Sequence, residues 1–388
     1  MAKPIVGINP EILKWARERA GYTLEHIAAT FKKEIREIEG WEAGVGSPTY
    51  SQLEKLAYQL YKRPLAIFFF PDPPEESDPV KEFRTLPGFE IENLLPDTRY
   101  AIRLGEAMQF GLREINDGIN PSDNKIFKDI RAYPGDSVDF LTKTVRDYLK
   151  IPISEQKIWK NNEEALKNWR NILQDLGIFI FKRSFKQKDI SGFSLFDNEF
   201  PIIYLNNSTA DTRQIFTIFH ELSHILFYGN GISKLDDSYI EVLSGQSREI
   251  EIFCNRFASE FLVPPTEFAK YIHLKQYDDE FISNIASIYK VSRELILRKF
   301  LDEGIVSQNY YQEKAREWNK QYEEKMRRGG GGNFYATQAT YLGEKFLNIA
   351  FGKYYQGKYT IEQLADYLNV KVHHVYGLEH FAFKKEAA

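Results

Sequence analysis

The segment Ile215-Phe216-Thr217-Ile218-Phe219-His220-Glu221-Leu222-Ser223-His224-Ile225-Leu226 contains the pattern HExxH, in which two histidines are four residues apart. On a helix this spacing places both imidazoles on one face, one turn apart, where they can hold a zinc ion. Apolar residues recur beside them at helical intervals, at positions 215, 218, 219, 222, 225 and 226. The segment therefore predicts a helix in a core, with its metal-binding face toward a cleft.

Short β-rich segments precede this helix. Residues 177–181, 192–196 and 201–206 are rich in Ile, Phe, Leu and Tyr and are separated by polar turns, so a small sheet is expected before the HExxH helix. Zinc peptidases with this order of elements hold their substrate as an added strand.

A catalytic zinc usually has three protein ligands and one position open to water, so the two histidines need a partner. A second helix is expected from residue 251, where Phe253, Phe257, Phe261 and Leu262 would form its packed stripe. This helix follows the HExxH segment along the chain. It is the place to look for the third ligand.

The HExxH pattern and the later run Glu251-Ile252-Phe253-Cys254-Asn255-Arg256-Phe257-Ala258-Ser259-Glu260-Phe261-Leu262-Val263-Pro264 together closely resemble the ImmA/IrrE family of zinc metallopeptidases. The resemblance implies that His220, His224 and Glu251 bind one zinc ion per chain and that Glu221 is the general base. It makes Asn255 a candidate partner of a metal ligand. Manganese or another divalent ion also suits such a site. Position 254 is more often alanine in the family, so Cys254 is interpreted as core packing.

The N-terminal part, residues 9–70, has the pattern of a bundle of short helices. Pro10 suits a first helical position, Gly21 ends a helix and Thr23 begins the next. This part resembles the Xre/Cro-type helix-turn-helix family, in which a helix near residues 33–40 would face the major groove of DNA. The expected DNA contacts are the basic residues Lys14, Arg17, Arg19, Lys32, Lys33 and Arg36.

The charge of this helix also supports another interpretation. Glu34, Glu37 and Glu39 lie among its basic residues, and carboxylates that face phosphates would repel them. The N-terminal part is therefore expected to be a DNA-binding module or, as the alternative, a helical module for docking or dimerisation.

The C-terminal third is expected to be mainly helical. Residues 282–301 have the pattern helix, tight turn, helix, with Ser292 capping the second helix. A charged helix at 312–328 precedes a glycine run at 329–332, which is interpreted as a flexible hinge because no Lys-Ser/Thr follows it. Thr360 is expected to cap a further small helix.

These segments predict a multi-domain α+β protein. The N-terminal all-α helix-turn-helix bundle would be followed by a zincin-like domain with a small β-sheet and the HExxH helix, and then by a mainly helical C-terminal region. The expected divisions are residues 1–70 for the helix-turn-helix domain, 71–176 for a linker and helical region, 177–311 for the metallopeptidase core with its following helix-turn-helix-like element, and 312–388 for the charged helix, hinge and last helical element.

Composition indicates where the protein works. The 388-residue chain has one cysteine and a net charge of −4, which exclude a disulfide framework and make any DNA contact depend on a local basic patch. The N-terminus lacks the pattern of a signal peptide, and the longest apolar run, residues 65–70, is too short to span a bilayer. A cytoplasmic protein without a membrane partner is expected.

Two functions fit these observations. The first is a regulatory zinc endopeptidase in a bacterial or mobile-element control circuit, with a specific protein such as a repressor as its substrate. The second is a DNA-binding transcriptional repressor, or an antitoxin, whose metallopeptidase fold serves mainly for binding. The corresponding partners are a protein substrate, double-stranded DNA and a toxin encoded by a neighbouring gene, and a homodimer is compatible with the sequence.

Overall fold

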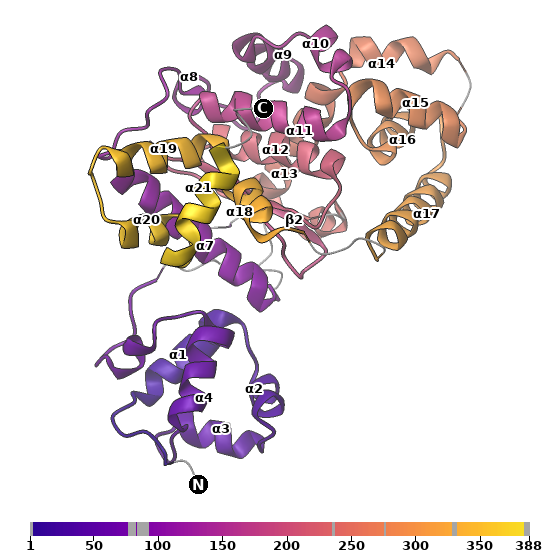
Figure 1. Ribbon diagram of the computed structural model, residues 1–388. Coiled ribbons are helices and arrows are strands. Elements are labelled where there is room, and N and C mark those ends of the chain that lie inside the picture. The colour runs from indigo at the N-terminus through magenta and orange to yellow at the C-terminus, as the bar shows by residue number, and fades with distance from the viewer. Residues whose placement is uncertain are drawn as a thin grey trace. The chain divides into compact units, whose positions relative to one another are not determined.

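The computed structural model describes residues 3–76, 83, 93–234, 237–274, 277–327 and 332–383. It is an α+β structure, mostly helical, with one small mixed sheet (Figure 1). The chain divides into two compact units, Met1–Leu104 and Gly105–Ala388, which we call unit 1 and unit 2. The hinge expected at residues 329–332 lies outside the described residues except for Gly332. No helix among the described residues is both long enough and apolar enough to span a membrane.

Unit 1 is helical. Its elements are α1 (Pro10–Ala20), α2 (Leu24–Phe31), α3 (Ile35–Glu42), α4 (Tyr50–Glu54), the short helices η1 (Lys55–Tyr61) and η2 (Leu65–Phe69), and the first part of α7 (Pro96–Ile115). The side chain of Asn9 accepts a bond from the first turn of α1, and Gly21 ends this helix with a φ of 77°. Thr23 caps α2 through a bond from the His26 amide, as its position in the sequence predicts.

Unit 2 contains the sheet and most of the helices. The helices before the sheet are α8 (Ile126–Asp129), α9 (Val138–Leu149), α10 (Ile153–Ile158) and α11 (Asn162–Asp175). The elements of the central part are β1 (Phe179–Arg183), β2 (Ile190–Leu195), β3 (Ile202–Asn206), α12 (Asp211–Leu226), β4 (Gly231–Lys234), η3 (Asp237–Val242) and α13 (Gly245–Leu262).

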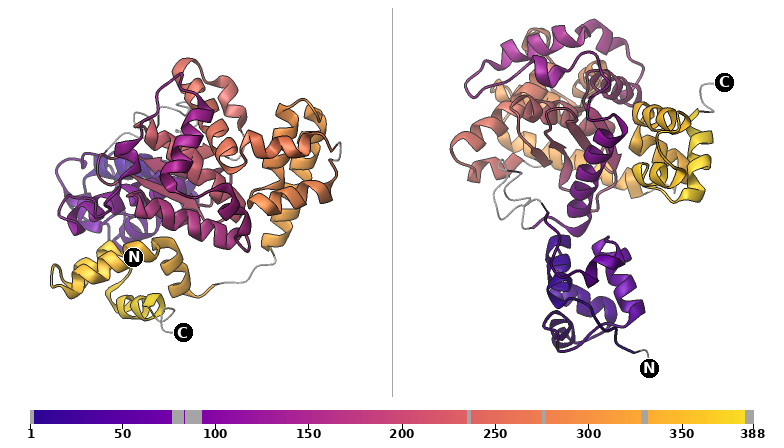
Figure 2. Two further views of the ribbon diagram at one scale, coloured as in Figure 1. Left: turned by 90° about the horizontal axis from the view of Figure 1, so that it is seen from above. Right: turned by 90° about the vertical axis from the view of Figure 1, so that its left-hand side faces the viewer.

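The remaining helices of unit 2 form two groups. The first comprises α14 (Pro265–Ile272), α15 (Asp279–Tyr289), α16 (Arg293–Asp302) and α17 (Gln308–Arg327), and the second α18 (Phe334–Leu342), α19 (Glu344–Tyr355), α20 (Ile361–Tyr367), η4 (Val372–His374) and α21 (Val375–Phe383). Figure 2 shows the second group gathered together, in yellow. Ser292 and Thr360 cap α16 and α20 through their side chains, which confirms both predicted caps.

The sheet has the order β1-β3-β2-β4. Strands β1 and β3 are parallel, and β2 is antiparallel to both β3 and β4. The first three strands occupy the segments that the sequence predicts, shifted by up to two residues. The fourth strand was not predicted, and it forms an edge of the sheet.

Helix α12 covers one face of the sheet and contacts β2, β3 and β4, while α11 and α13 pack against it (Figure 1). Gly192 of β2 makes this close approach possible. A Cβ atom at this position would lie 2.7 Å from Thr217 Cγ2 of α12 and 2.7 Å from the Tyr204 carbonyl oxygen. Any side chain there would push α12 away from the sheet.

Arg170, a buried residue of α11, links the second helical group to the open edge of β1. The Arg170 guanidinium donates to the Ile180 carbonyl of β1 at 2.5 and 2.8 Å and to the carbonyls of Thr340 and Tyr341 at 2.6 and 3.1 Å. These last two carbonyls belong to the final turn of α18. A single side chain thus donates hydrogen bonds to carbonyl groups at a strand edge and at a helix end, which would otherwise lack partners.

Lys182 of β1 is a buried cation beside this arginine, and we expect it to destabilise unit 2 in a pH-dependent way. Burial, with Arg170 as a second cause, lowers the pKa of Lys182 to about 7 against the opposing effect of Asp211 and Glu163. An unfolded lysine has a pKa of about 10.4. The unfolded chain therefore binds more protons between these values, so stability rises with pH there, and the penalty is complete below pH 7.

The variant Lys182→Met should remove this penalty. We expect its melting temperature to exceed that of the wild type by roughly 5 °C at pH 6, since one kcal/mol is worth about 2–4 °C in a domain of this size. The difference should shrink as the pH rises toward 10. Lys143→Met, which replaces an exposed lysine of α9, is the control for calorimetry. A difference that does not change with pH would contradict the assignment.

Candidate metal centre

Two neighbouring helices bring three potential metal ligands together. His220 and His224 lie one turn apart on α12, and Glu251 lies in α13, which packs against α12. All three side chains are buried, with exposed fractions of 2%, 1% and 0%. Their ligand atoms lie within 4.8 Å of one another. Among the described residues, these three form the cluster of His, Cys, Asp or Glu side chains that could hold a metal ion.

The distances within the cluster fit a tetrahedral metal. His220 Nε2 lies 3.1 Å from His224 Nε2 and 3.4 Å from Glu251 Oε2, and His224 Nε2 lies 3.3 Å from Glu251 Oε1. Two ligands that bind zinc at 2.0–2.1 Å in a tetrahedron are about 3.3 Å apart. The three donor atoms are thus already spaced as a zinc ion would hold them.

The histidines are oriented from α13. Asn255 Oδ1 lies 2.9 Å from His220 Nδ1. Since the amide oxygen only accepts, this contact puts the proton on Nδ1 and leaves the Nε2 lone pair toward the cluster. Cys254, the preceding residue, is buried and its thiol interacts with His224 and Ser223. Consecutive residues of α13 therefore contact the two imidazoles.

Tyr239 contributes a contact that the sequence did not reveal. Its hydroxyl donates to Glu251 Oε2 at 2.7 Å, and both side chains are buried. The other carboxylate oxygen, Oε1, is buried and has no hydrogen-bond partner among the described residues. A buried carboxylate oxygen without a partner is costly. This arrangement is the one expected if Tyr239 fixes Oε2 while Oε1 is kept for a cation.

Glu221 lies between α12 and the sheet, where two serines hold it. Ser194 of β2 donates to Glu221 Oε2 at 2.6 Å, and Ser233 of β4 donates to Oε1 at 2.5 Å. Gly231 of β4 permits this approach, because a Cβ atom there would lie 2.6 Å from Glu221 Oε2 and would also overlap the His224 ring. Neither serine stood out in the sequence, since each lies in a segment with no local motif.

The electrostatics favour an ionised carboxylate beside a basic imidazole. Burial raises the pKa of Glu251, but the neighbouring His224 and His220 more than reverse this and hold the pKa well below its ordinary value. Burial lowers the pKa of His224, while Cys254 and Glu251 raise it well above its ordinary value. Without a cation, the cluster therefore holds a proton on His224. A metal ion at the same place would replace that positive charge.

The residues of unit 1 that are expected to bind DNA differ in their exposure and in their ion pairs. Lys14, Lys32 and Arg36 are exposed, and Arg19 is half-buried. Lys33 forms an ion pair with Glu37 and lies over the Trp41 ring. Arg17 is buried, and its guanidinium is bonded to Glu42 at 2.7 and 2.9 Å. Arg17 therefore joins α1 to α3 inside unit 1 rather than lying on its surface.

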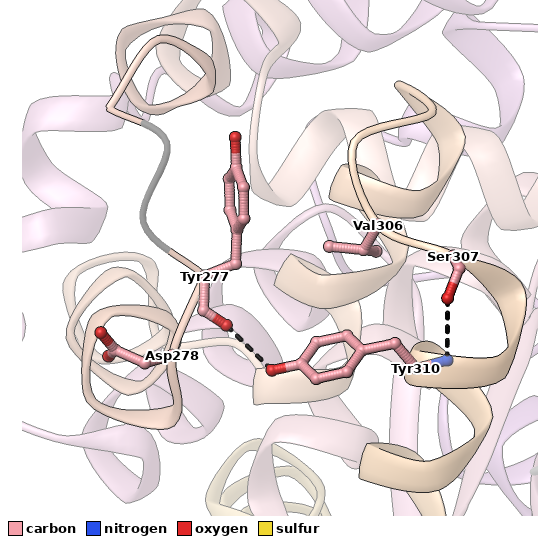
Figure 3. Close-up of a pocket in the computed structure, with 5 residues that line it drawn as sticks. All are labelled: Tyr277, Asp278, Val306, Ser307 and Tyr310. Carbon is pink, nitrogen blue, oxygen red and sulfur yellow. Dashed lines mark hydrogen bonds between the residues drawn. The ribbon is translucent and has the colours of Figure 1, made fainter.

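A separate pocket lies between the first turn of α15 and the start of α17 (Figure 3). Its lining residues are Tyr277, Asp278, Val306, Ser307 and Tyr310. The Tyr310 hydroxyl donates to the Tyr277 carbonyl at 3.1 Å, and Asp278 caps α15. These polar groups already join structural elements to each other, and we assign no chemistry to this pocket.

We expect Tyr239→Phe to weaken zinc binding by about 10–100-fold, the usual effect of removing a hydrogen-bond partner of a metal ligand. The variant loses one hydroxyl and retains the buried ring. Competition with a chromophoric chelator measures the affinity. Tyr310→Phe removes a hydroxyl of the pocket in Figure 3 and should bind zinc as the wild type does. Equal affinities in all three proteins would show that Tyr239 does not act on Glu251.

Zinc binding should also release a proton and weaken as the pH falls. The reason is that the raised pKa of His224 keeps this imidazole protonated in the metal-free protein, and the proton must leave when its nitrogen binds a cation. We expect affinity to fall up to about tenfold per pH unit below the raised pKa. Calorimetry in two buffers of different ionisation enthalpy counts the protons. An affinity that is constant from pH 6 to pH 8 would contradict this expectation.

Sequence comparison places a family on this part of the chain. Residues 173–301, which run from the end of α11 to the end of α16, match the family model described as Peptidase_M78, the IrrE N-terminal-like domain. No curated protein matches the chain. The matched residues include the sheet, α12 and α13, and so the whole cluster of His220, His224 and Glu251. The match supports a metallopeptidase of the ImmA/IrrE type in this part of the chain.

Proposed function

We propose that the protein is a regulatory zinc-dependent endopeptidase that hydrolyses a peptide bond of a specific protein. The observation that carries this proposal is the convergence of His220, His224 and Glu251 at tetrahedral spacing, inside the segment that matches a peptidase family. Three ligands leave one position of a tetrahedral zinc free, which is the arrangement of catalytic rather than structural sites. Within the described residues, no fourth His, Cys, Asp or Glu completes the group.

Glu221 is the proposed general base. A zinc ion held by His220, His224 and Glu251 would polarise the peptide carbonyl and lower the pKa of water toward neutrality. The Glu221 carboxylate accepts the proton as water attacks the carbonyl carbon, and it then delivers the proton to the leaving amine nitrogen. The hydroxyls of Ser194 and Ser233 fix the orientation of this carboxylate.

Strand β4 is the proposed place for the substrate backbone. It is the last strand in the sheet order, so one edge of β4 has no partner strand among the described residues. It also lies directly against the centre, because a Cβ atom at Gly231 would overlap the His224 ring and lie 2.6 Å from Glu221 Oε2. An extended peptide that adds to this edge would bring its carbonyl groups close to the metal cluster.

The proposed regulatory role comes from the families that the two parts of the chain resemble. ImmA/IrrE-like peptidases act in bacterial or mobile-element control circuits, and the proposed substrate is a specific protein such as a repressor. Unit 1, with its Xre/Cro-like pattern, would serve to bind DNA or to dock a partner. The ion pairs of Arg17 and Lys33 reduce the basic surface of unit 1, which favours docking.

The second candidate function is a DNA-binding repressor or an antitoxin. The exposed side chains of Lys14, Lys32 and Arg36 favour it, because basic groups on a helical bundle can contact phosphates. In this case the metallopeptidase fold would serve binding, and Glu221 would have no role in turnover. The two candidates therefore differ in what a change at Glu221 does in cells.

We expect Glu221→Gln to retain the fold and the metal and to lose at least about 10²-fold in turnover, since proton transfer by a positioned base typically contributes 10²–10⁴-fold. Replacing His220, His224 or Glu251 by Ala should instead remove the metal. The measurement is mass-spectrometric mapping of new protein N-termini in cells that express each variant with the products of the neighbouring genes. Glu260→Gln is the control, because Glu260 pairs with Arg256 on α13.

The outcomes separate the two functions. New N-termini that appear with the wild type and Glu260→Gln, and not with Glu221→Gln, would establish the peptidase and identify its substrate. Full cleavage by Glu221→Gln would exclude Glu221 as the base. Identical sets of N-termini in all strains, together with binding of a promoter fragment, would favour the repressor.

A further inference from the structure

A stack of three aromatic rings and one arginine lies at the C-terminal end of α12. It comprises Tyr133, Arg131, Tyr228 and Phe196, and we call it the Arg131 stack. The Arg131 guanidinium carbon lies 5.0 Å from the centre of the Tyr133 ring and 4.3 Å from that of Tyr228. The Tyr228 ring is in turn stacked on Phe196 at 4.8 Å and 22°. Three separate segments of the chain thus meet around one cation.

The backbone fixes each of these segments. The Ala132 amide donates to the Leu226 carbonyl at 2.9 Å, which attaches residues 131–133 to the end of α12. The Phe196 amide donates to Asn230 Oδ1 at 2.7 Å. Tyr228 has a φ of +58°, in the left-handed region that bulky residues rarely occupy. The chain therefore accepts an uncommon backbone conformation where it places the Tyr228 ring beneath Arg131.

Arg131 differs from three other arginines on the surface of unit 2. Arg113, Arg256 and Arg298 form ion pairs with Asp197, Glu260 and Asp302. Arg131 is exposed, and it has no ion pair with any residue that the structure describes. The nearby Asp136 accepts a bond from the Tyr133 amide instead. Aromatic rings contact the faces of a guanidinium, and such contacts leave its N–H groups available to a carboxylate.

The Arg131 stack adjoins the proposed substrate strand. Tyr228 is four residues after His224, and the amide of the next residue, Gly229, donates to the His224 carbonyl at 3.0 Å. Phe196 is two residues after Ser194, which holds Glu221. Asn230, bonded to Phe196, directly precedes the first residue of β4. A peptide that lies along the edge of β4 and continues past Gly231 therefore reaches the Arg131 stack.

We propose that the Arg131 stack is a specificity subsite that binds an acidic residue of the substrate, a few residues from the bond that is cut. This inference rests on the proposed function, because it assumes that a peptide occupies the edge of β4. A carboxylate suits the subsite since guanidinium binds it in a bidentate way with charge-assisted hydrogen bonds. The carboxylate is supplied by an Asp or Glu side chain or by the C-terminus of the peptide.

The overall charge of the protein excludes one other explanation for a preference for acidic peptides. The chain has a net charge of −4, so a preference for acidic peptides cannot come from general attraction. Arg131 also lies near the C-terminal end of α12, where a cation is favourable for the helix dipole. A purely structural role would therefore change the melting temperature and leave peptide selection as it was.

The experiment measures binding of a random peptide array by the zinc-loaded, full-length Glu221→Gln protein, which is expected to hold peptides without cutting them. The same protein is tested with Arg131→Gln, with Arg131→Lys and with Arg316→Gln as the matched control, since Arg316 is an exposed arginine of α17. Each peptide is present with a free and with an amidated C-terminus. The melting temperature of every variant is recorded.

We expect peptides that contain Asp or Glu to bind about tenfold more tightly than the same peptides with Asn or Gln instead, since a charge-assisted hydrogen bond contributes this much. Arg131→Gln should abolish this preference, Arg131→Lys should restore part of it, and Arg316→Gln should leave it intact. Loss of the preference on amidation would identify the C-terminus as the source of the carboxylate, and its persistence would identify a side chain. An unchanged preference in Arg131→Gln would overturn the subsite and leave the peptidase. Binding of no peptide by any variant would overturn both.

Discussion

The structure of the site depends on one buried charge, the carboxylate of Glu251. A charged group in a protein interior costs several kcal/mol unless partners surround it. Here Glu251 lies on α13, and its partners are two imidazoles of α12 and one tyrosine hydroxyl of η3. One oxygen is satisfied by Tyr239, and the other faces the histidines with no hydrogen bond within the described chain. The packing of α12 against α13 is thus stable only if a proton or a metal ion balances this charge.

A second constraint is the presence of glycine at two positions of the sheet, which lets the sheet lie close to this cluster. Gly192 lets α12 lie close to β2, and Gly231 lets β4 pass beside His224 and Glu221. The hydroxyls of Ser194 and Ser233 can then reach both oxygens of the Glu221 carboxylate. The same strands lead directly into Phe196 and Tyr228, the rings beside Arg131. The metal ligands, the proposed base and the proposed specificity subsite are therefore all linked to α12, through α13, the sheet and the segment that follows the helix.

Much of the fold around the site could be predicted from the sequence, because local patterns determine it. HExxH on an apolar stripe indicates α12, and runs of Ile, Phe and Leu indicate the first three strands. Strand β4 could not be predicted, since its four residues Gly231–Lys234 contain a single large apolar side chain and no alternation. The roles of Tyr239 and the two serines were hidden for another reason: each contact joins residues on different elements, and no local spacing encodes it. Arg17 likewise looks like a surface cation until Glu42 is seen beside it.

The central claim is that His220, His224 and Glu251 together hold one catalytic zinc ion. The most direct test is X-ray absorption at the zinc edge of the full-length protein, combined with metal analysis. The account predicts one zinc per chain, bound by nitrogen and oxygen at about 2.0–2.1 Å, with two imidazoles and no sulfur. A zinc–sulfur distance near 2.3 Å would bring Cys254 into the coordination sphere and contradict the account. So would a chain that binds no zinc.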